Sequence, residues 1–154
     1  MKFPAAVAAL VMVVITALLS SCGSGSGSAP SSPLQTNEAL WRSRALSSYR
    51  YMLTTAAFNT QAGHPVIVEV HKGATASITP VEGGFTPDST YFAQYSTVEK
   101  LFDVIRNAED AKANQVTTSY DSHDGFPANA FVDPIRQAAD DEFGFQVSAF
   151  QALP

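Results

Sequence analysis

Apolar residues along the chain form one continuous N-terminal run, followed by short periodic segments. The run covers residues 5–19 and contains a single polar residue, Thr16. Beyond it, apolar positions recur every two residues or every three to four, which are the repeats of a half-buried strand and of an amphipathic helix. The pattern therefore predicts a separate N-terminal segment and one folded domain.

The first half of the domain is predicted to contain one helix and three strands. Asn37 can cap a helix that continues through Trp41 to Leu46. Two-residue alternation and valine-rich composition then predict three strands, at residues 49–55, 65–71 and 74–79. Residues 82–94 contain two glycines and a proline and are predicted to form a loop.

The second half is predicted to contain one long helix and three more strands. Ser96 and Glu99 have the spacing of a capping box at the start of the helix. Apolar residues then recur on a single helical face, namely Val98, Leu101, Phe102, Ile105 and Ala108. Alternation predicts strands at residues 115–121, at residues 128–133, and at Phe143, Phe145, Val147 and Ala149.

These elements follow the order α-β-β-β-α-β-β-β, with short turns between most of them. Short connections between consecutive strands favour antiparallel pairing. The sequence therefore predicts an α+β fold, with a single antiparallel sheet of about five to six strands and two helices packed on one face.

The N-terminal run has the features of a bacterial lipoprotein signal. It follows Lys2, is shorter than the roughly 20 residues of a membrane-spanning helix, and ends in Leu19-Ser20-Ser21-Cys22. In the lipoprotein pathway the thiol of such a cysteine receives a diacylglycerol, and the chain is cut before it. An ordinary secreted protein and an uncut signal anchor are the alternatives.

The expected organisation follows from this signal and from the Gly-, Ser- and Pro-rich stretch behind it, which is typical of a flexible linker. It comprises a signal peptide at residues 1–21, a lipidated Cys22 and linker at residues 22–34, and one domain at residues 35–154. Two or more acyl chains hold a protein firmly on a bilayer. We therefore expect the domain to be anchored to the cell membrane or the outer membrane, facing out of the cytoplasm.

The chain is acidic, with 9 basic and 14 acidic side chains and a net charge of −5. Such a protein has no electrostatic attraction to nucleic acid, so we expect no nucleic-acid partner. Cys22 is the only cysteine, and its lipidation leaves no thiol for a disulfide. The domain must then be stabilised by its core alone, and we expect no cofactor.

Six acidic residues in the last third of the chain are candidate ligands: Asp121, Asp124, Asp133, Asp140, Asp141 and Glu142. Arg136 is the only lysine or arginine among residues 121–142. Calcium prefers clustered carboxylate and carbonyl oxygens, so the group could stabilise a calcium-binding structural module. Paired carboxylates could also serve a hydrolase. In the favoured interpretation they are separate turn and cap residues, each bonded to nearby backbone amides.

Histidines and loop aromatics are the remaining candidates. His64, His71 and His123 lack the spacing of metal ligands or of a catalytic site, and we expect them at the surface. Four aromatic residues occur in and just after the predicted loop: Phe85, Tyr91, Phe92 and Tyr95. They are predicted either to contact a partner or to cover the open end of the core.

Several short motifs occur together in the domain. They are Tyr49-Arg50-Tyr51 after the tryptophan helix, the segment Thr97 to Ile105, Tyr120-Asp121, Gly125-Phe126-Pro127, Asp133 and Asp140-Asp141-Glu142. In this combination the chain resembles the family of unknown function DUF6174 over residues 41–150, which implies a bacterial secreted protein or lipoprotein of unassigned activity. Members of this family often carry a Cys-x-Cys pair after the first strand. Thr55-Ala56-Ala57-Phe58-Asn59 stands there in this chain, so no redox or metal role of that pair transfers.

These observations favour a membrane-tethered, non-enzymatic binding or interaction module of the cell envelope. The partner would be an envelope protein or an envelope polymer. A calcium-stabilised structural module is the alternative, followed by a hydrolase. A binding module predicts an exposed apolar patch, a calcium module predicts converging carboxylates, and an enzyme predicts a cleft with titratable groups of shifted pKa.

Overall fold

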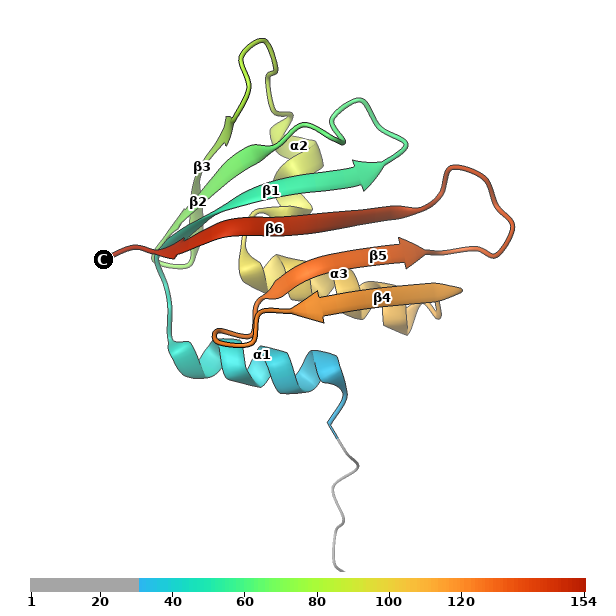
Figure 1. Ribbon diagram of the computed structural model, residues 1–154, viewed down its shortest axis with the longest axis horizontal. Helices are drawn as coiled ribbons and strands as arrows, with labels where there is room; N and C mark the ends of the chain where they lie inside the picture. Colours follow the sequence, from blue (N-terminus) through green and yellow to red (C-terminus); the bar gives the residue numbers. More distant parts are fainter. Residues whose placement is uncertain (1–30) are drawn as a thin grey trace, which may run out of the picture.

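Residues 31–154, the part of the chain that the computed structural model describes, form a six-stranded antiparallel sheet with three helices (Figure 1). The strands are β1 (Tyr49–Ala57), β2 (Val66–His71), β3 (Ala74–Pro80), β4 (Gln115–Tyr120), β5 (Pro127–Asp133) and β6 (Phe143–Ala152). Their order across the sheet is β3-β2-β1-β6-β5-β4. The central pair β1 and β6 therefore joins the two halves of the domain, and the predicted antiparallel sheet is confirmed.

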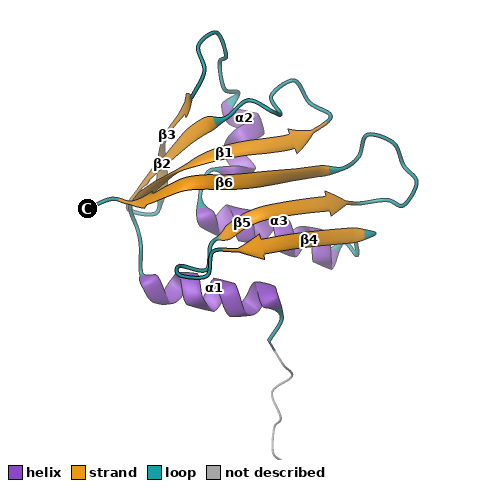
Figure 2. Cartoon of the chain, viewed as in Figure 1, coloured by secondary structure: helices purple, strands orange, loops and turns teal. Residues whose placement is uncertain are grey.

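The helices are α1 (Pro33–Arg44), α2 (Ser89–Phe92) and α3 (Val98–Asp110), with a 3-10 turn, η1 (Ala93–Tyr95), between the last two. α2 and α3 lie behind the sheet in the view of Figure 2, and α1 lies below its β4 edge. The predicted count of two helices is too low, because the expected loop contains α2. Asp88 caps this short helix by accepting a hydrogen bond from the Thr90 amide at 2.8 Å. Within residues 31–154, no helix is both long and apolar enough to cross a membrane.

α1 begins earlier than predicted. Ser32 and Gln35 form a capping box, in which each side chain accepts a hydrogen bond from the other residue's amide at 3.0–3.2 Å. Pro33 suits the first helical position, since its missing amide would have no partner there. The expected cap, Asn37, lies inside the helix. Ala45 adopts a left-handed conformation (φ 52°), so α1 ends before it rather than reaching Leu46.

α3 also begins with a different cap from the predicted one. Thr97, not Ser96, caps the helix by accepting a hydrogen bond from the Lys100 amide at 3.3 Å. The Ser96 hydroxyl instead donates to the carbonyl of Ala93 at 2.9 Å. The Glu99 carboxylate does not complete a capping box, because it bonds to side chains of α1 and β1.

The core lies between the sheet and α3. β1 and β2 alternate as predicted, and α3 turns its predicted apolar face to the sheet. The side chains at most 1% exposed include Tyr49, Tyr51, Leu53, Val66, Val68, Val70, Val98, Leu101, Phe102 and Ile105. Strong two-residue and helical periodicity in the sequence therefore identifies the core correctly.

The predicted alternation of β6 fails at its C-terminal end. Ala149 has a positive φ of 49°, and the register between β1 and β6 shifts opposite Arg50 and Met52. Such a bulge reverses which side chains face the core. Phe150, not Ala149, therefore packs against the ring of Trp41, with ring centroids 5.8 Å apart.

α1 is fitted closely against the turn between β4 and β5. A Cβ atom at Gly125 would lie 2.6 Å from the carbonyl oxygen of Asn37, and Gly125 has a φ of 81°. Only glycine suits both constraints. The next residue, Phe126, is buried and stacks on Phe150 with ring centroids 4.5 Å apart.

Candidate functional site

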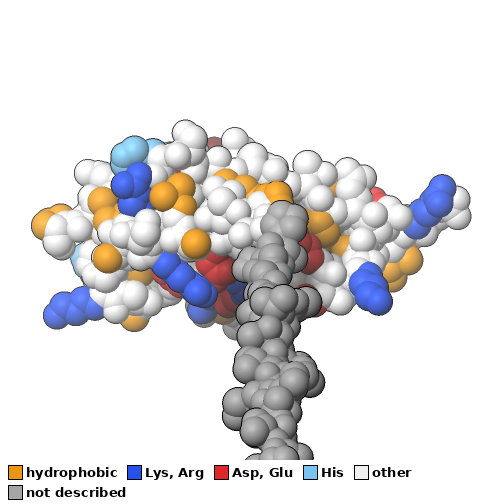
Figure 3. Space-filling view, turned by 90° about the horizontal axis from the view of Figure 1, so that it is seen from below, with side chains coloured by type: hydrophobic (Ala, Val, Ile, Leu, Met, Phe, Trp, Pro, Cys, Tyr) orange, Lys and Arg blue, Asp and Glu red, His pale blue; other side chains and the backbone are white. Residues whose placement is uncertain are grey.

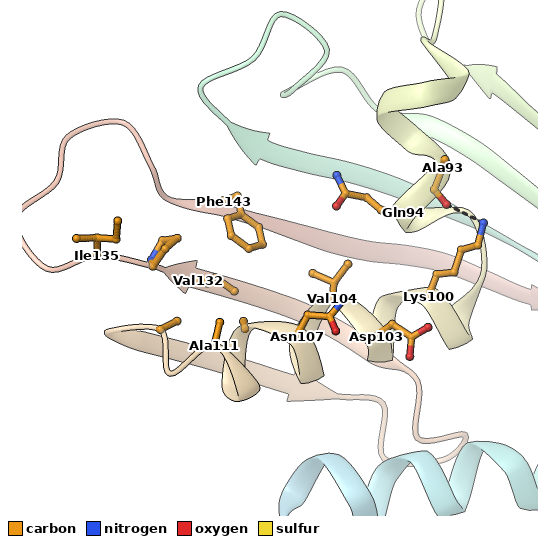
Figure 4. A pocket seen from close by; sticks show the side chains of 13 residues that line it. Ala93, Gln94, Lys100, Asp103, Val104, Asn107, Ala111, Val132, Ile135 and Phe143 are labelled. Atoms are coloured by element: carbon orange, nitrogen blue, oxygen red, sulfur yellow. Dashed lines mark hydrogen bonds between the residues drawn. The ribbon is translucent and has the colours of Figure 1, made fainter.

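An open groove of about 700 Å³ lies behind the sheet, between α3, η1 and the ends of β5 and β6 (Figure 4). It is lined by Ala93, Gln94, Lys100, Asp103, Val104, Asn107, Ala108, Ala111, Ala113, Val132, Pro134, Ile135 and Phe143. We call this hollow the α3 groove. Clefts of this size suit ligands or partner side chains with a substantial apolar part.

The α3 groove exists because the layer behind the sheet is incomplete. In Figure 4, α3 and η1 diverge and leave the strands between them uncovered. The end of α3 presents the small side chains of Ala108 and Ala111, and Ala113 follows in the turn. Larger residues there would fill the space against Val132 and Phe143.

Both charged side chains that line the α3 groove are already bonded within the chain. The Lys100 ammonium donates to the carbonyl of Ala93 at 2.8 Å and to the Ser96 hydroxyl at 2.9 Å. Asp103 is in an ion pair with Arg106. The groove therefore offers a mainly apolar surface, on which Asp103 is charge-paired and the Lys100 ammonium is held in place with its positive charge retained.

Two smaller hollows, of about 270 and 300 Å³, lie near the start of β6. The larger one shares Gln94 with the α3 groove and lies on the same side of the sheet, whereas the smaller one is lined by Ala56 and Phe131, which face the opposite side. Phe143 lines all three hollows. Phe58, Asp140 and Glu142 line both smaller hollows, and Phe58 is 83% exposed. Ile135, at the edge of the α3 groove, is 63% exposed. The α3 groove and the hollow of about 300 Å³ therefore form one concave surface from α3 to the end of β1.

The six acidic candidates separate into two groups at opposite ends of β5. Asp121 and Asp124 lie in the β4–β5 turn. The Asp121 carboxylate accepts hydrogen bonds from the amides of His123 and Asp124 at 2.9 and 2.7 Å. Asp124 is paired with Arg44 at 3.2 Å. Both acids are thus engaged locally, as the turn interpretation predicts.

The other four acids lie at the end of β5 and in the β5–β6 loop. Asp133 accepts a hydrogen bond from the Asn114 side chain at 2.5 Å, and Asp141 accepts one from the Ile135 amide at 3.1 Å. Asp140 and Glu142 are exposed. Across residues 31–154, no three or more His, Cys, Asp or Glu side chains are grouped so as to hold a metal ion.

The four loop aromatics have different surroundings. Phe92 and Tyr95 are 0% and 2% exposed, so the structure places them in the core instead of on a contact surface. Tyr91 is half-buried, and its hydroxyl donates to the Thr55 hydroxyl at 3.0 Å. Phe85 is half-buried and stacks on His64, with ring centroids 4.3 Å apart. Two of the four aromatics therefore belong to the core, and Phe85 and Tyr91 pack against it.

The three histidines lie apart, and all are exposed. His64 contacts Phe85, His71 is 2.7 Å from the Glu69 carboxylate, and His123 is 2.8 Å from that of Asp124. Each has a different neighbourhood.

The sequence patterns do not reveal a hydrogen-bonded group that joins α1, β1 and α3. The Trp41 indole donates to one Glu99 oxygen at 2.9 Å, and the Tyr49 hydroxyl donates to the other at 3.1 Å. The Tyr49 oxygen also accepts a hydrogen bond from the Val98 amide at 3.0 Å. Burial, together with the neighbouring Glu99, raises the pKa of Tyr49 well above its ordinary value. This group lies away from the α3 groove and acts as a structural junction.

The sequence profile of the family of unknown function DUF6174 matches residues 33–152. The chain belongs to DUF6174. The match begins at the first residue of α1 and ends at the last residue of β6, so it covers the whole sheet and every helix of the described residues. The chain matches no curated protein and no solved structure.

In this DUF6174 domain, several motif residues that carry the family resemblance meet at Trp41. The Trp41 ring packs edge-on against Tyr49 and Phe126, with ring centroids 5.2 and 6.4 Å away. Gly125 allows the turn to approach α1. These motif residues therefore pack α1 against β1 and the β4–β5 turn. Cys22 lies outside both the family match and the described residues.

Proposed function

We propose that this DUF6174 protein is a lipid-anchored protein of the cell envelope whose domain binds an apolar group of a partner in the α3 groove. The proposal rests on the presence of this groove. Its volume of about 700 Å³ lies within the range of ligand sites, and its lining is mainly apolar with a few polar groups.

The polar lining favours binding over catalysis. Lys100 and Asp103 are held by neighbours in the chain, which leaves them poorly placed to exchange protons with a substrate. Gln94 and Asn107 carry uncharged amides, which suit hydrogen bonds that orient a bound group. Binding of an apolar group would remove water from the exposed Ile135 and the half-buried Phe143, and such burial drives association.

The anchor is part of the proposal. Cys22 stands at the end of the N-terminal apolar run and is the only cysteine. Two or more acyl chains on Cys22 of the mature protein would keep the groove at the membrane surface. The face that bears α1 has basic, acidic and apolar side chains interspersed, so its visible part does not resemble a basic membrane-binding surface (Figure 3). Attachment through lipid is consistent with that face.

An uncharged dye whose fluorescence rises in apolar surroundings, such as Nile red, tests the groove. The protein is the mature chain from residue 22 with Cys22→Ser, which carries no lipid. Asn107→Trp fills the groove from α3, and Glu109→Trp places the same side chain on the opposite face of that helix. We expect dye binding to be lost in Asn107→Trp and kept in Glu109→Trp. Equal binding by both variants would contradict the proposal.

Cell fractionation tests the anchor. We expect the wild-type protein in the membrane fraction and Cys22→Ser in the soluble fraction, with its signal peptide uncut or cut elsewhere. A correctly sized mature Cys22→Ser protein that still sediments with membranes would show that the lipid is not the attachment.

A further inference from the structure

The α3 groove does not end at Phe143, because the hollow of about 300 Å³ continues from it on the same side of the sheet, toward the end of β1. Gln94 and Phe143 line both the groove and one of the smaller hollows. The path crosses from β5 over β6 to the end of β1. Two strand spacings of about 4.8 Å make this crossing roughly 10 Å, which is about three residues of extended peptide.

The far end of this path is strongly acidic. Asp140 and Glu142 are exposed and line both smaller hollows, and neither is in an ion pair with another described residue. Asp141 lies between them, with one oxygen bonded to the Ile135 amide and the other buried without a partner in residues 31–154. Arg136 in the same loop is the only nearby base in the sequence, so the local charge stays negative.

An exposed aromatic ring adjoins these carboxylates. Phe58 is 83% exposed and lines both hollows with Asp140 and Glu142. A cation placed there could meet the face of the ring and the carboxylates together, which suits lysine or arginine. The opposite end of the path, at Val104, is apolar. The surface thus combines an apolar cleft with an acidic cleft that contains an aromatic ring. About three residues of an extended peptide would span the distance between them.

We infer that the occupant of the α3 groove is a segment of a partner protein with a large apolar side chain and a lysine or arginine two to four residues away. This inference rests on the proposed function and adds the chemistry of the partner. The apolar side chain enters the α3 groove, and the basic side chain reaches Asp140 and Glu142 beside Phe58. An anionic bilayer fits this surface poorly, because lipid phosphates would meet the carboxylates of the β5–β6 loop.

Short end-blocked peptides test the inference against the mature Cys22→Ser chain. The first peptide carries leucine and phenylalanine, with two lysines placed two to four residues away from them. The second peptide has glutamates in place of the lysines, and the third has serines in place of the apolar residues. Binding is measured by titration calorimetry and by displacement of Nile red. We expect only the first peptide to bind, and its binding to weaken at high salt.

Two protein variants with the same change in net charge locate the effect. Asp140→Asn with Glu142→Gln should weaken binding of the lysine peptide by about tenfold, as expected for the loss of two exposed ion pairs. Glu69 and Glu82 line none of the three hollows, so the control variant Glu69→Gln with Glu82→Gln should bind the lysine peptide as tightly as the unsubstituted domain does.

Each other outcome has a definite meaning. Equal binding of the lysine and glutamate peptides, or no effect of Asp140→Asn with Glu142→Gln, would overturn the inference while Nile red binding keeps the proposed function intact. Loss of both peptide and dye binding would overturn both. Sedimentation of the unlipidated chain with anionic vesicles, dependent on Phe58 and without peptide binding, would assign the surface to the membrane instead.

Discussion

The carboxylate of Glu99 accepts a hydrogen bond from the indole nitrogen of Trp41 at 2.9 Å, across 58 positions of sequence. Its second oxygen accepts one from the hydroxyl of Tyr49. Trp41 and Tyr49 are 3% and 0% exposed, so neither donor has ready access to water as a substitute partner. One carboxylate on α3 therefore orients two buried side chains from α1 and β1.

Removal of this carboxylate should destabilise the domain. Glu99→Ala leaves two buried donors without partners, and each such loss costs about 1–3 kcal/mol. We expect the free energy of unfolding, measured by urea denaturation of the mature Cys22→Ser chain, to fall by at least about 1 kcal/mol. Glu109→Ala removes an exposed carboxylate from the same helix and should change it by less than about 0.5 kcal/mol. Equal effects of the two substitutions would show that the junction contributes no stability.

Buried tyrosines should make the domain sensitive to alkaline pH. Burial raises the pKa of Tyr95 from 10.0 to about 12, and that of Tyr51 well above its ordinary value. The unfolded chain ionises near pH 10 while the folded chain keeps these hydroxyls neutral. Their contribution to stability is complete below pH 10 and is lost as the pH rises toward 12.

The measurement is the urea midpoint as a function of pH. We expect a decline that starts near pH 10, and a shallower decline in Tyr95→Phe because one titrating group is gone. A midpoint that stays constant up to pH 12, or the same slope in Tyr95→Phe, would show that Tyr95 titrates alike in the folded and unfolded chains.

The helical register of α3 predicts large effects in its core face. Phe102 and Ile105 are 1% and 0% exposed beneath the sheet. Either residue changed to alanine leaves a cavity and should lower the free energy of unfolding by about 2–5 kcal/mol. Asp103→Ala, on the exposed side of the same turn, is the matched control. A loss below about 0.5 kcal/mol at Phe102 or Ile105 would contradict this packing.

Calcium should have no specific effect on stability. The two groups of acids lie at opposite ends of β5, and Asp121 already accepts two backbone amides. We expect the same melting temperature in chelator and in millimolar calcium at matched ionic strength. A calcium-specific rise of several degrees that Asp121→Asn or Asp140→Asn abolishes would instead reveal a bound ion, because a ligand of the folded state stabilises it.

Much of the fold follows from the sequence because its periodic segments are long. The alternation at Tyr49, Tyr51 and Leu53 and the spacing in α3 each have one interpretation that buries their apolar residues. The helix caps were harder to predict, since Ser96 and Thr97 are adjacent and either can cap. The bulge at Ala149 depends on pairing with β1, and no local pattern reveals it.

The site was less predictable than the fold. The α3 groove exists because two helical segments separate behind the sheet, and their relative placement depends on tertiary packing. Small residues such as Ala108 and Ala111 were a weak signal, because alanine also suits any helix. The exposure of Phe58 could not be inferred either, as an aromatic residue after a strand is more often buried.

Site-specific photocrosslinking in intact cells tests directly whether the anchored protein binds its partner through the α3 groove. A photoreactive residue replaces Asn107 inside the groove, or Glu109 on the opposite face of α3, in the chain with its native Cys22. We expect a defined envelope adduct from position 107, attached at a segment that carries apolar and basic side chains, and none from position 109. The same adducts from both positions, or no adduct from position 107, would show that the partner does not bind in the α3 groove.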